Sequence, residues 1–286
     1  MTPAEHPPNL LTIPCELRNA VYVLVFDHSV TYPKQPLPVA EEREGDLLQI
    51  NADELFENDS VTSRRPSHHL APLRTCRQIH DEAHLMAVSL TTFHVRDDDT
   101  LPDCFIQRSS RLRTSKLSAI RHMTLAARIS QLRALNEEWN GRPFGNELLK
   151  LDTLQITPRR PSVAGPYARV SALSQGHTLA YVFVETFKAL RNVNMLVVRN
   201  DGCFDPETWR IAYRSVIYRM WRWGGAECGV RFEGPDENDP DPSFKVYFGR
   251  CDAKEKPRGH EVGAEVYRLA EMTGELPNID DAGVDP

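Results

Sequence analysis

Apolar segments alternate with amphipathic segments along the chain from residue 118 onward, and this alternation restricts the fold most. Residues 118–126, 151–156 and 193–198 have the short apolar pattern of strands. Residues 129–139 and 178–190, which lie between them, have helical periodicity, and Gly141 is expected to stop the first of these helices. Strands joined by helices pair in parallel. We therefore predict a largely parallel sheet with helices packed on it.

The three predicted strands share apolar residues at positions 1, 4 and 6. The three sets are Ile120, Met123 and Leu125; Leu151, Leu154 and Ile156; and Val193, Leu196 and Val198. This pattern resembles the strand core of a leucine-rich repeat. The spacing of 31 and then 42 residues is longer and less regular than in such repeats, and the usual Asn is missing. The pattern fits either a degenerate leucine-rich-repeat-like sheet or an ordinary open α/β sheet.

The predicted α/β domain spans residues 104–276. After its third predicted strand, the domain continues with a long helix. Asp205 and Pro206 are expected to start this helix, which runs to about residue 223. Residues 230–232 and 244–248 are predicted to form a hairpin around a polar loop, and residues 262–272 to form a helix ended by Gly274. Residues 277–286 are expected to be a loose tail.

Two amphipathic helices are predicted in the first hundred residues. The first begins at Pro14 and carries Leu17, Val21, Leu24 and Val25 on one stripe. The second begins near Pro72, and its stripe comprises Leu73, Cys76, Ile79, Ala83, Met86 or Ala87, and Leu90. Because neither stripe is stable in water, we expect the two helices to pack together. Between them, residues 31–69 are predicted to be a long surface loop with a short helical turn at 52–56, and residues 96–103 an acidic loop.

Composition excludes several classes of protein. The longest uninterrupted apolar run, residues 20–26, is far shorter than a membrane span, and residues 1–8 lack the pattern of a secretory signal. The six cysteines are far apart, without a C-x-x-C motif, at positions 15, 76, 104, 203, 228 and 251. This spacing suits neither a disulfide framework nor a zinc framework. We therefore expect an intracellular protein, cytoplasmic or nuclear, with no membrane partner.

The net charge of −6 conceals an uneven distribution. Residues 101–223 carry 19 Lys and Arg against 9 Asp and Glu, whereas residues 1–100 and 224–286 each have a net charge of −8. A basic middle between two acidic ends either attracts an acidic partner or is neutralised by the chain itself.

The N-terminal third resembles a known family. Residues 10–22 read LLTIPCELRNAVY, residues 73–83 read LRTCRQIHDEA, and residues 91–93 read TTF. These segments resemble the L-P-x-E-L-R-x-x-I-Y helix, the C-R-Q-I-x-x-E-A helix and the N-T-F segment of a large filamentous-fungal family of F-box-like (EXR-type) domains. Ile13 and Thr91 depart from the family pattern, and the two helices are separated by a long insert. The resemblance covers residues 10–96.

The resemblance implies a function that no other feature of the sequence indicates. An F-box domain docks on a Skp-type adaptor and so links a target protein to a cullin ubiquitin ligase. The positions that the resemblance carries over as adaptor-facing are Pro14, Glu16, Leu17, Val21 and Tyr22. In the alternative interpretation, Leu17, Val21 and Leu24 are core residues that pack on Cys76, Ile79 and Ala83. Arg18 and Arg77 are also expected to pair with Glu82 or Asp81, which would join the helices without any chemistry.

No residue pattern in the chain predicts catalysis. His80 and His84 are four residues apart on a predicted helix, but Asp81 stands where the zinc-protease motif needs Glu, and no third ligand is evident. Nucleophile-elbow, Walker and dinucleotide-binding motifs are absent from the sequence. The acidic run of Asp97, Asp98 and Asp99 lacks the glycine and closing Glu of a calcium loop. We expect no cofactor and no resident metal.

The helix at 205–223 is a second candidate interaction surface. Its predicted inner face comprises Trp209, Ala212, Tyr213, Val216, Ile217 and Met220. Its predicted basic face comprises Arg210, Arg214, Arg219 and Arg222, with Trp221 beside them. Such a face either contacts phosphates or an acidic peptide, or pairs with the acidic terminal segments. An isoelectric point near 5.9 argues against nucleic acid as the main partner.

The sequence thus predicts an α+β to α/β protein in which an F-box-like helical module, residues 10–96, packs against a largely parallel, degenerate leucine-rich-repeat-like strand–helix sheet. The main functional hypothesis is a non-enzymatic protein–protein interaction protein, in its strongest form a ubiquitin-ligase substrate receptor. The alternative is a single-domain binding protein without that role, and a remote alternative is a metal-dependent enzyme around His80 and His84. The oligomeric state is not indicated.

Overall fold

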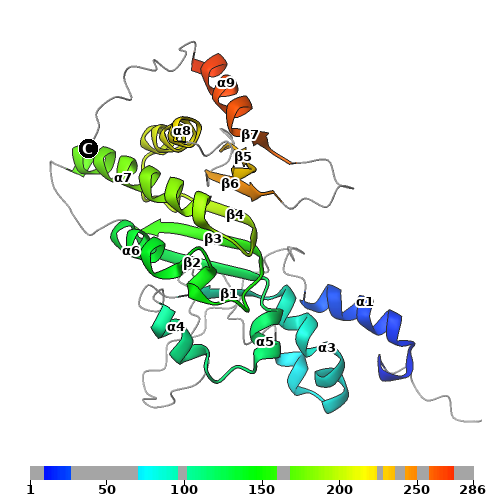
Figure 1. Cartoon of the computed structure of the whole chain (residues 1–286). Helices are drawn as coiled ribbons and strands as arrows, with labels where there is room; N and C mark the ends of the chain where they lie inside the picture. Colours follow the sequence, from blue (N-terminus) through cyan, green and yellow to red (C-terminus); the bar gives the residue numbers. More distant parts are fainter. Residues whose placement is uncertain are drawn as a thin grey trace, which may run out of the picture.

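A seven-stranded mixed sheet forms the centre of the protein (Figure 1). The computed structural model describes residues 10–26, 70–95, 102–159, 168–223, 228–235, 242–249 and 258–273. The strands are β1 (Thr92–Val95), β2 (His122–Arg128), β3 (Leu151–Arg159), β4 (Val193–Arg199), β5 (Val230–Glu233), β6 (Ser243–Phe248) and β7 (His260–Glu261). Their order is β1-β2-β3-β4-β6-β5-β7, in which β1 to β4 are parallel and the later pairs antiparallel. The predicted mostly parallel sheet and the β5–β6 hairpin are confirmed.

The register of the strands explains the repeated apolar pattern. Met123 lies opposite Leu154, which lies opposite Leu196, and Leu125, Ile156 and Val198 form the next row. Residues paired across neighbouring strands point to the same side of a sheet, so the pattern marks one continuous face. Both rows extend through the antiparallel strands to Val246 and Phe244. All of these side chains are buried.

Helices cover this buried face. They are α6 (Ile129–Trp139), α7 (Ala168–Ala189), α8 (Pro206–Arg222) and α9 (Val262–Thr273), each of which packs beside the next. Phe244 lies at the centre of an aromatic cluster, with ring centroids 5.1 Å from Tyr213, 5.6 Å from Trp209 and 6.2 Å from Phe183. The main hydrophobic core is therefore the layer between the sheet and these helices.

The opposite face of the sheet is polar and partly exposed. Burial alternates along every one of the six longer strands, at least over most of its length. One row across this face comprises His94, Thr124, Gln155, Val197, Lys245 and Glu233. Alternation of this kind is typical of a sheet with its core on one side only. The sheet therefore has one apolar face and one polar face.

The ends of two helices follow the predicted local signals. α6 ends at Trp139, and Gly141 two residues later has a φ of +75°, a conformation that favours glycine. A side chain at position 141 would overlap the carbonyl oxygen of Ala189. At the start of α8, the carboxylate of Asp205 accepts a hydrogen bond of 2.9 Å from the backbone N–H of Thr208. The six residues of the predicted inner face of α8 are all buried, as predicted.

The N-terminal helices form a second, smaller core. They are η1 (Leu10–Thr12), α1 (Cys15–Phe26), η3 (Ala71–Arg74) and α3 (Arg77–Leu90), and they lie beyond the β1 edge of the sheet (Figure 1). The buried residues of this core are Tyr22, Phe26, Ala83 and Ala87. The predicted packing of the two helices is confirmed. The second helix starts later than predicted, because Cys76 is its N-cap, with its sulfur 3.4 Å from the backbone nitrogen of Ile79.

The structure corrects the region between residues 92 and 121. Residues 92–95 form strand β1, whose short length conceals its pattern, although Phe93 and Val95 are buried. The helices α4 (Pro102–Ser109) and α5 (Thr114–Ala119) follow, so Pro102 and Asp103 belong to a helix and not to the predicted acidic loop. β2 accordingly starts at His122 and not at residue 118. A short turn, η5 (Pro143–Gly145), buries Phe144 beside α4.

Strand β1 lies between the two predicted units. The predicted module ends at residue 96 and the predicted α/β domain begins at 104, and β1, within the predicted module, forms the edge of the sheet. The predicted loop at 31–69 and tail at 277–286 lie outside the described residues. Within the described part of the chain, no helix is both long and apolar enough to cross a membrane.

Candidate protein-interaction surfaces

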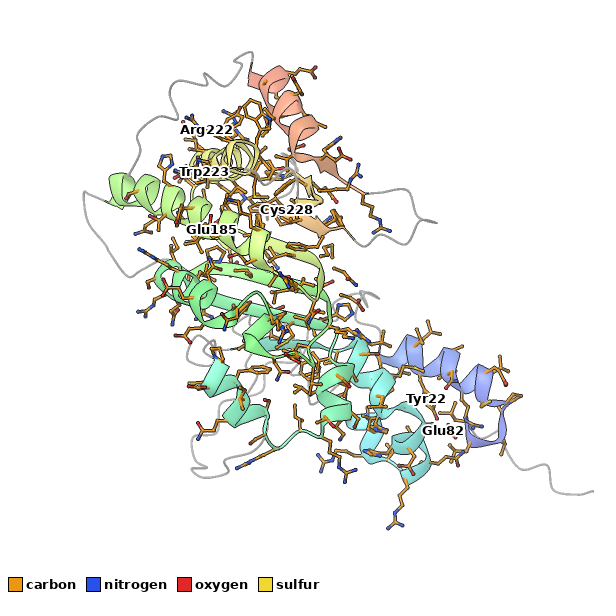
Figure 2. All side chains as sticks on the ribbon, in the orientation of Figure 1. Tyr22, Glu82, Glu185, Arg222, Trp223 and Cys228 are labelled. Carbon is orange, nitrogen blue, oxygen red and sulfur yellow. The ribbon has the colours of Figure 1, made fainter. Side chains whose placement is uncertain are left out.

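A polar clamp holds α1 against α3. The guanidinium of Arg18 donates two hydrogen bonds to the carboxylate of Glu82, from Nε at 2.9 Å and from Nη2 at 2.8 Å. The hydroxyl of Tyr22 donates to the same carboxylate at 3.1 Å, and Arg18 also donates to the carbonyl oxygen of Ile13 at 2.6 Å. The predicted pairing of Arg18 with Glu82 is confirmed. Four residues from two helices and the preceding turn thus fix the orientation of α1. Figure 2 shows Tyr22 and Glu82 where α1 and α3 lie together.

The charges of the clamp stabilise each other. The hydrogen bonds from Arg18 and then Gln78 hold the pKa of the Glu82 carboxyl below its usual value, and Glu82 in turn raises the pKa of Arg18. Burial, followed by the hydrogen bond to Glu82, raises the pKa of Tyr22. At neutral pH the clamp is therefore an ionised Arg–Glu pair with a neutral tyrosine donor.

The clamp leaves an apolar face of α1 in solvent. Leu17 is 57% exposed and Leu24 is 59% exposed, while Val25 is exposed and Val21 partly so. The interpretation of Leu17 and Leu24 as core residues is therefore wrong. Tyr22 and Phe26, one turn apart, take the buried side instead, because their larger rings fill the space against Ala83 and Ala87.

The predicted adaptor-facing residues divide between the two sides of α1. Pro14, Glu16 and Leu17 are exposed, and Val21 is half-buried beside them. Tyr22 is only 2% exposed and donates its hydroxyl to Glu82, so it faces α3 and not a partner. The apolar face of α1 is defined from here on as Leu17, Val21, Leu24 and Val25.

The clamp should respond to acid. Because the pKa of Glu82 is lowered in the folded protein, its stabilising effect is present above the ordinary glutamate pKa of about 4.3 and is lost as the pH falls through the lower folded value. We expect wild type to resist urea better than Glu82→Gln at pH 7, and this difference to shrink as the pH falls below about 4. Urea denaturation of both proteins, followed by circular dichroism between pH 7 and pH 3, measures this difference in stability. A difference that stays constant over this range would show that Glu82 is not held as an anion.

The histidines of α3 do not form a metal site with other described residues. The rings of His80 and His84 stack at a centroid distance of 4.9 Å, and Nδ1 of His84 lies 2.8 Å from the carbonyl oxygen of His80. Nδ1 of His80 lies 3.3 Å from the carboxylate of Asp81. Among the described residues, no three His, Cys, Asp or Glu side chains are grouped so that they could hold a metal ion.

The cavity between α6, α7 and β3 is too small for a substrate. Its volume is about 10 Å³, room for roughly one water molecule. The polar side chains at its wall bond to each other, because the hydroxyl of Thr186 donates to the Asn136 side-chain oxygen at 2.6 Å. It offers neither space nor an unpaired polar group to a ligand.

The predicted basic face of α8 lies on the solvent side of the helix layer. Arg210, Trp221 and Arg222 are exposed, and Arg214 and Arg219 are partly exposed. Neither Arg210 nor Arg214 pairs with a carboxylate of the described residues. The acidic terminal segments that were the alternative partners of this face fall largely outside those residues.

A cluster that the sequence did not indicate surrounds Trp223 at the end of α8. The guanidinium carbon of Arg219 lies 5.0 Å and the ammonium of Lys188 5.9 Å from the centre of the Trp223 ring, and the ring of Tyr181 lies 6.3 Å away, edge-on. Figure 2 shows Trp223 and Glu185 where α7 and α8 lie together. Tyr181 and Lys188 come from α7, so helical periodicity within α8 could not find them. Their only signal is the i, i+4, i+7 spacing of Tyr181, Glu185 and Lys188.

No protein-family model, no curated protein and no solved structure matches this chain. The F-box-like resemblance of residues 10–96 therefore stays a prediction, and the functional argument rests on the surfaces described above.

Proposed function

We propose that this protein is a non-enzymatic protein–protein interaction protein that docks a partner on the apolar face of α1. In its strongest form, residues 10–96 act as an F-box-like module that binds a Skp-type adaptor and links a target to a cullin ubiquitin ligase. The strand–helix region, with its leucine-rich-repeat-like strand pattern, would then carry the target. The observation that supports the proposal best is the exposed apolar face of α1, a helix whose other side is held against α3.

Exposure of the apolar face of α1 to water costs free energy. Full burial of an exposed Leu or Val side chain contributes roughly 1.5–3 kcal/mol. The apolar face of α1 presents four such side chains in adjacent turns. Because the four side chains are already partly buried, a partner that covered them would gain roughly half of this free energy. It would also pay little for ordering α1, because Arg18, Tyr22 and Glu82 already fix the helix.

The polar surroundings of the apolar face of α1 agree with a docking surface. Pro14 and Glu16 are exposed at the start of α1, where the backbone N–H groups of the first turn help to lower the pKa of Glu16. Glu16 is therefore an anion at the rim of the apolar face. Interfaces commonly have this arrangement of an apolar centre with a charged rim.

One observation favours the second candidate function, a single-domain binding protein without a ubiquitin-ligase role. β1 continues directly from α3 through Thr91 and forms the edge of the main sheet, so the helical module and the sheet share a strand. Under this alternative, the two F-box-like segments are structural. The two candidates differ in whether a Skp-type adaptor binds.

Binding of a purified Skp-type adaptor by isothermal titration calorimetry tests the proposal. We expect a dissociation constant of about 10 μM or tighter for wild type and a loss of at least tenfold for Leu17→Asp, because a buried carboxylate would replace an apolar contact. Asn19→Asp is the matched control, since Asn19 is exposed on the same helix and the substitution adds the same charge on another side. Circular dichroism checks that both variants are folded.

Two results would contradict the proposal. Absence of binding by wild type at about 100 μM would eliminate the ubiquitin-ligase form and leave the single-domain alternative. An equal loss for Leu17→Asp and Asn19→Asp would show that the apolar face is not the contact surface.

A further inference from the structure

We propose that the cluster around Trp223 is a docking site for an acidic segment of a partner protein, rich in Asp and Glu and containing an aromatic residue. The site, called the Trp223 patch from here on, comprises Tyr181 and Lys188 of α7 and Arg219, Arg222 and Trp223 at the end of α8. It lies on a different part of the molecule from the apolar face of α1. A protein that failed to bind an adaptor could still bind a partner here.

The first argument is the exposure of two large aromatic side chains that contact each other. Trp223 is 41% exposed and Tyr181 is 47% exposed. Large aromatic residues of a chain are usually buried, and this chain buries Trp139 and Trp209. Trp, Tyr and Arg are also the residues that contribute most to binding at protein interfaces. The patch therefore has the composition of an interface centre.

The second argument is the charge of the patch. Arg219 and Lys188 lie beside the Trp223 ring, and Lys188 also pairs with the carboxylate of Glu185 at 3.5 Å. Arg219 pairs with no carboxylate of the described residues, and its guanidinium lies over the Trp223 ring. Arg219 is partly buried, and this burial lowers the pKa of its guanidinium. A carboxylate brought beside Arg219 would thus meet a partly desolvated cation that pairs with no carboxylate of the described residues.

The third argument concerns geometry. The contacts of Arg219, Lys188 and Tyr181 hold the indole of Trp223 in one position, so a partner would not pay to order it. An indole beside cations offers an aromatic residue a stacking surface and offers carboxylates direct partners. Both kinds of contact are available within one or two helical turns. This combination selects an acidic peptide with an aromatic residue over a purely apolar partner.

The full-length protein can be tested with a fluorescent peptide. The probe is a labelled twelve-residue peptide of Glu and Asp with one central Phe, followed by fluorescence anisotropy at low and at physiological salt. We expect wild type to bind with a dissociation constant on the order of 10–100 μM, weakened by salt. Trp223→Ala should weaken binding at least tenfold and Arg219→Gln about three- to tenfold.

Arg210→Gln is the matched control. It removes the same charge from the same helix, but position 210 lies about 14 Å or more along the axis from the patch. Its affinity should stay within about twofold of wild type. Because Trp223 and Arg219 are partly exposed, the variants should fold, and thermal melting checks this.

Three results would overturn the proposal. The first is a wild-type protein that fails to bind the peptide at 1 mM at low salt, which would mean that the chain's own acidic segments satisfy the patch. The second is an Arg210→Gln variant that loses as much affinity as Arg219→Gln. The third is a labelled single-stranded oligonucleotide that binds more tightly than the peptide, because the partner would then be a nucleic acid.

Discussion

Phe244→Ala is expected to lower the free energy of unfolding of the sheet region by about 3–5 kcal/mol. Phe244 is only 2% exposed, and its ring contacts rings from α7 and α8, two neighbouring helices of the layer that covers the sheet. Removing it leaves a cavity at the centre of the aromatic cluster, which Trp209 and Tyr213 are too rigidly packed to fill. Urea denaturation followed by far-ultraviolet circular dichroism measures the change.

Lys245→Ala is the matched control for this prediction. Lys245 is the next residue of the same strand, but it points to the polar face of the sheet, where its ammonium lies 2.8 Å from Glu233. An exposed ion pair of this kind contributes about 1 kcal/mol or less. Equal destabilisation by the two substitutions would show that the two faces of β6 do not differ as described.

The second large effect is expected for Phe26→Ala in the N-terminal core. Phe26 has no exposed surface, and the core it belongs to has three other buried residues, Tyr22, Ala83 and Ala87. Loss of about 3 kcal/mol or more from so small a core should detach α1 from α3. Hydrogen exchange followed by mass spectrometry should show amide protection in α1 falling by roughly 100-fold or to the unfolded level.

Leu24→Ala separates a core effect from a general effect on α1. Leu24 is in the same helix, two residues away, but it is 59% exposed. Its replacement should leave the protection of α1 almost unchanged, because Ala is also a good helix former. A loss of protection as large as that of Phe26→Ala would mean that α1 presents the opposite side to α3.

Hydrogen exchange in the Phe26→Ala variant also shows whether the helical module and the sheet unfold as two units or as one, which is where the two candidate functions differ in domain organisation. Protection of β2, β3 and β4 should persist if the helical module and the sheet open independently. Loss of protection throughout these strands would show one cooperative unit, as the single-domain alternative predicts. The two separate hydrophobic cores favour independent opening.

Several features followed from local sequence because they depend on neighbouring residues alone. The alternation of strands and helices predicted the central sheet, and the period of 3.6 residues predicted six of the seven buried residues of α8, all except Thr208. Asp205 and Gly141 marked helix ends through a side-chain cap and a left-handed conformation. Each of these signals is complete within about one helical turn or one strand.

The orientation of α1 required the tertiary structure. The spacing of Leu17, Val21 and Leu24 predicts that this stripe forms the buried side. The other side of the helix is also apolar, so periodicity alone cannot decide which side is buried. The contacts of Arg18 and Tyr22 with Glu82, more than fifty residues later, turn that stripe outward. Residues 92–95 were missed for a similar reason, because four residues are too few for a pattern and only pairing with β2 makes them a strand.

The Trp223 patch shows most clearly which features local sequence predicts and which depend on tertiary packing. Sequence alone determined that α8 has a buried face and a basic face, because both are set by the spacing of side chains along one helix. Only the tertiary structure placed Lys188 and Tyr181 beside Trp223, since these residues are separated by 35 and 42 positions and meet through the packing of α7 on α8. Local free energies select helices and strands, whereas burial of the shared core selects which of them become neighbours.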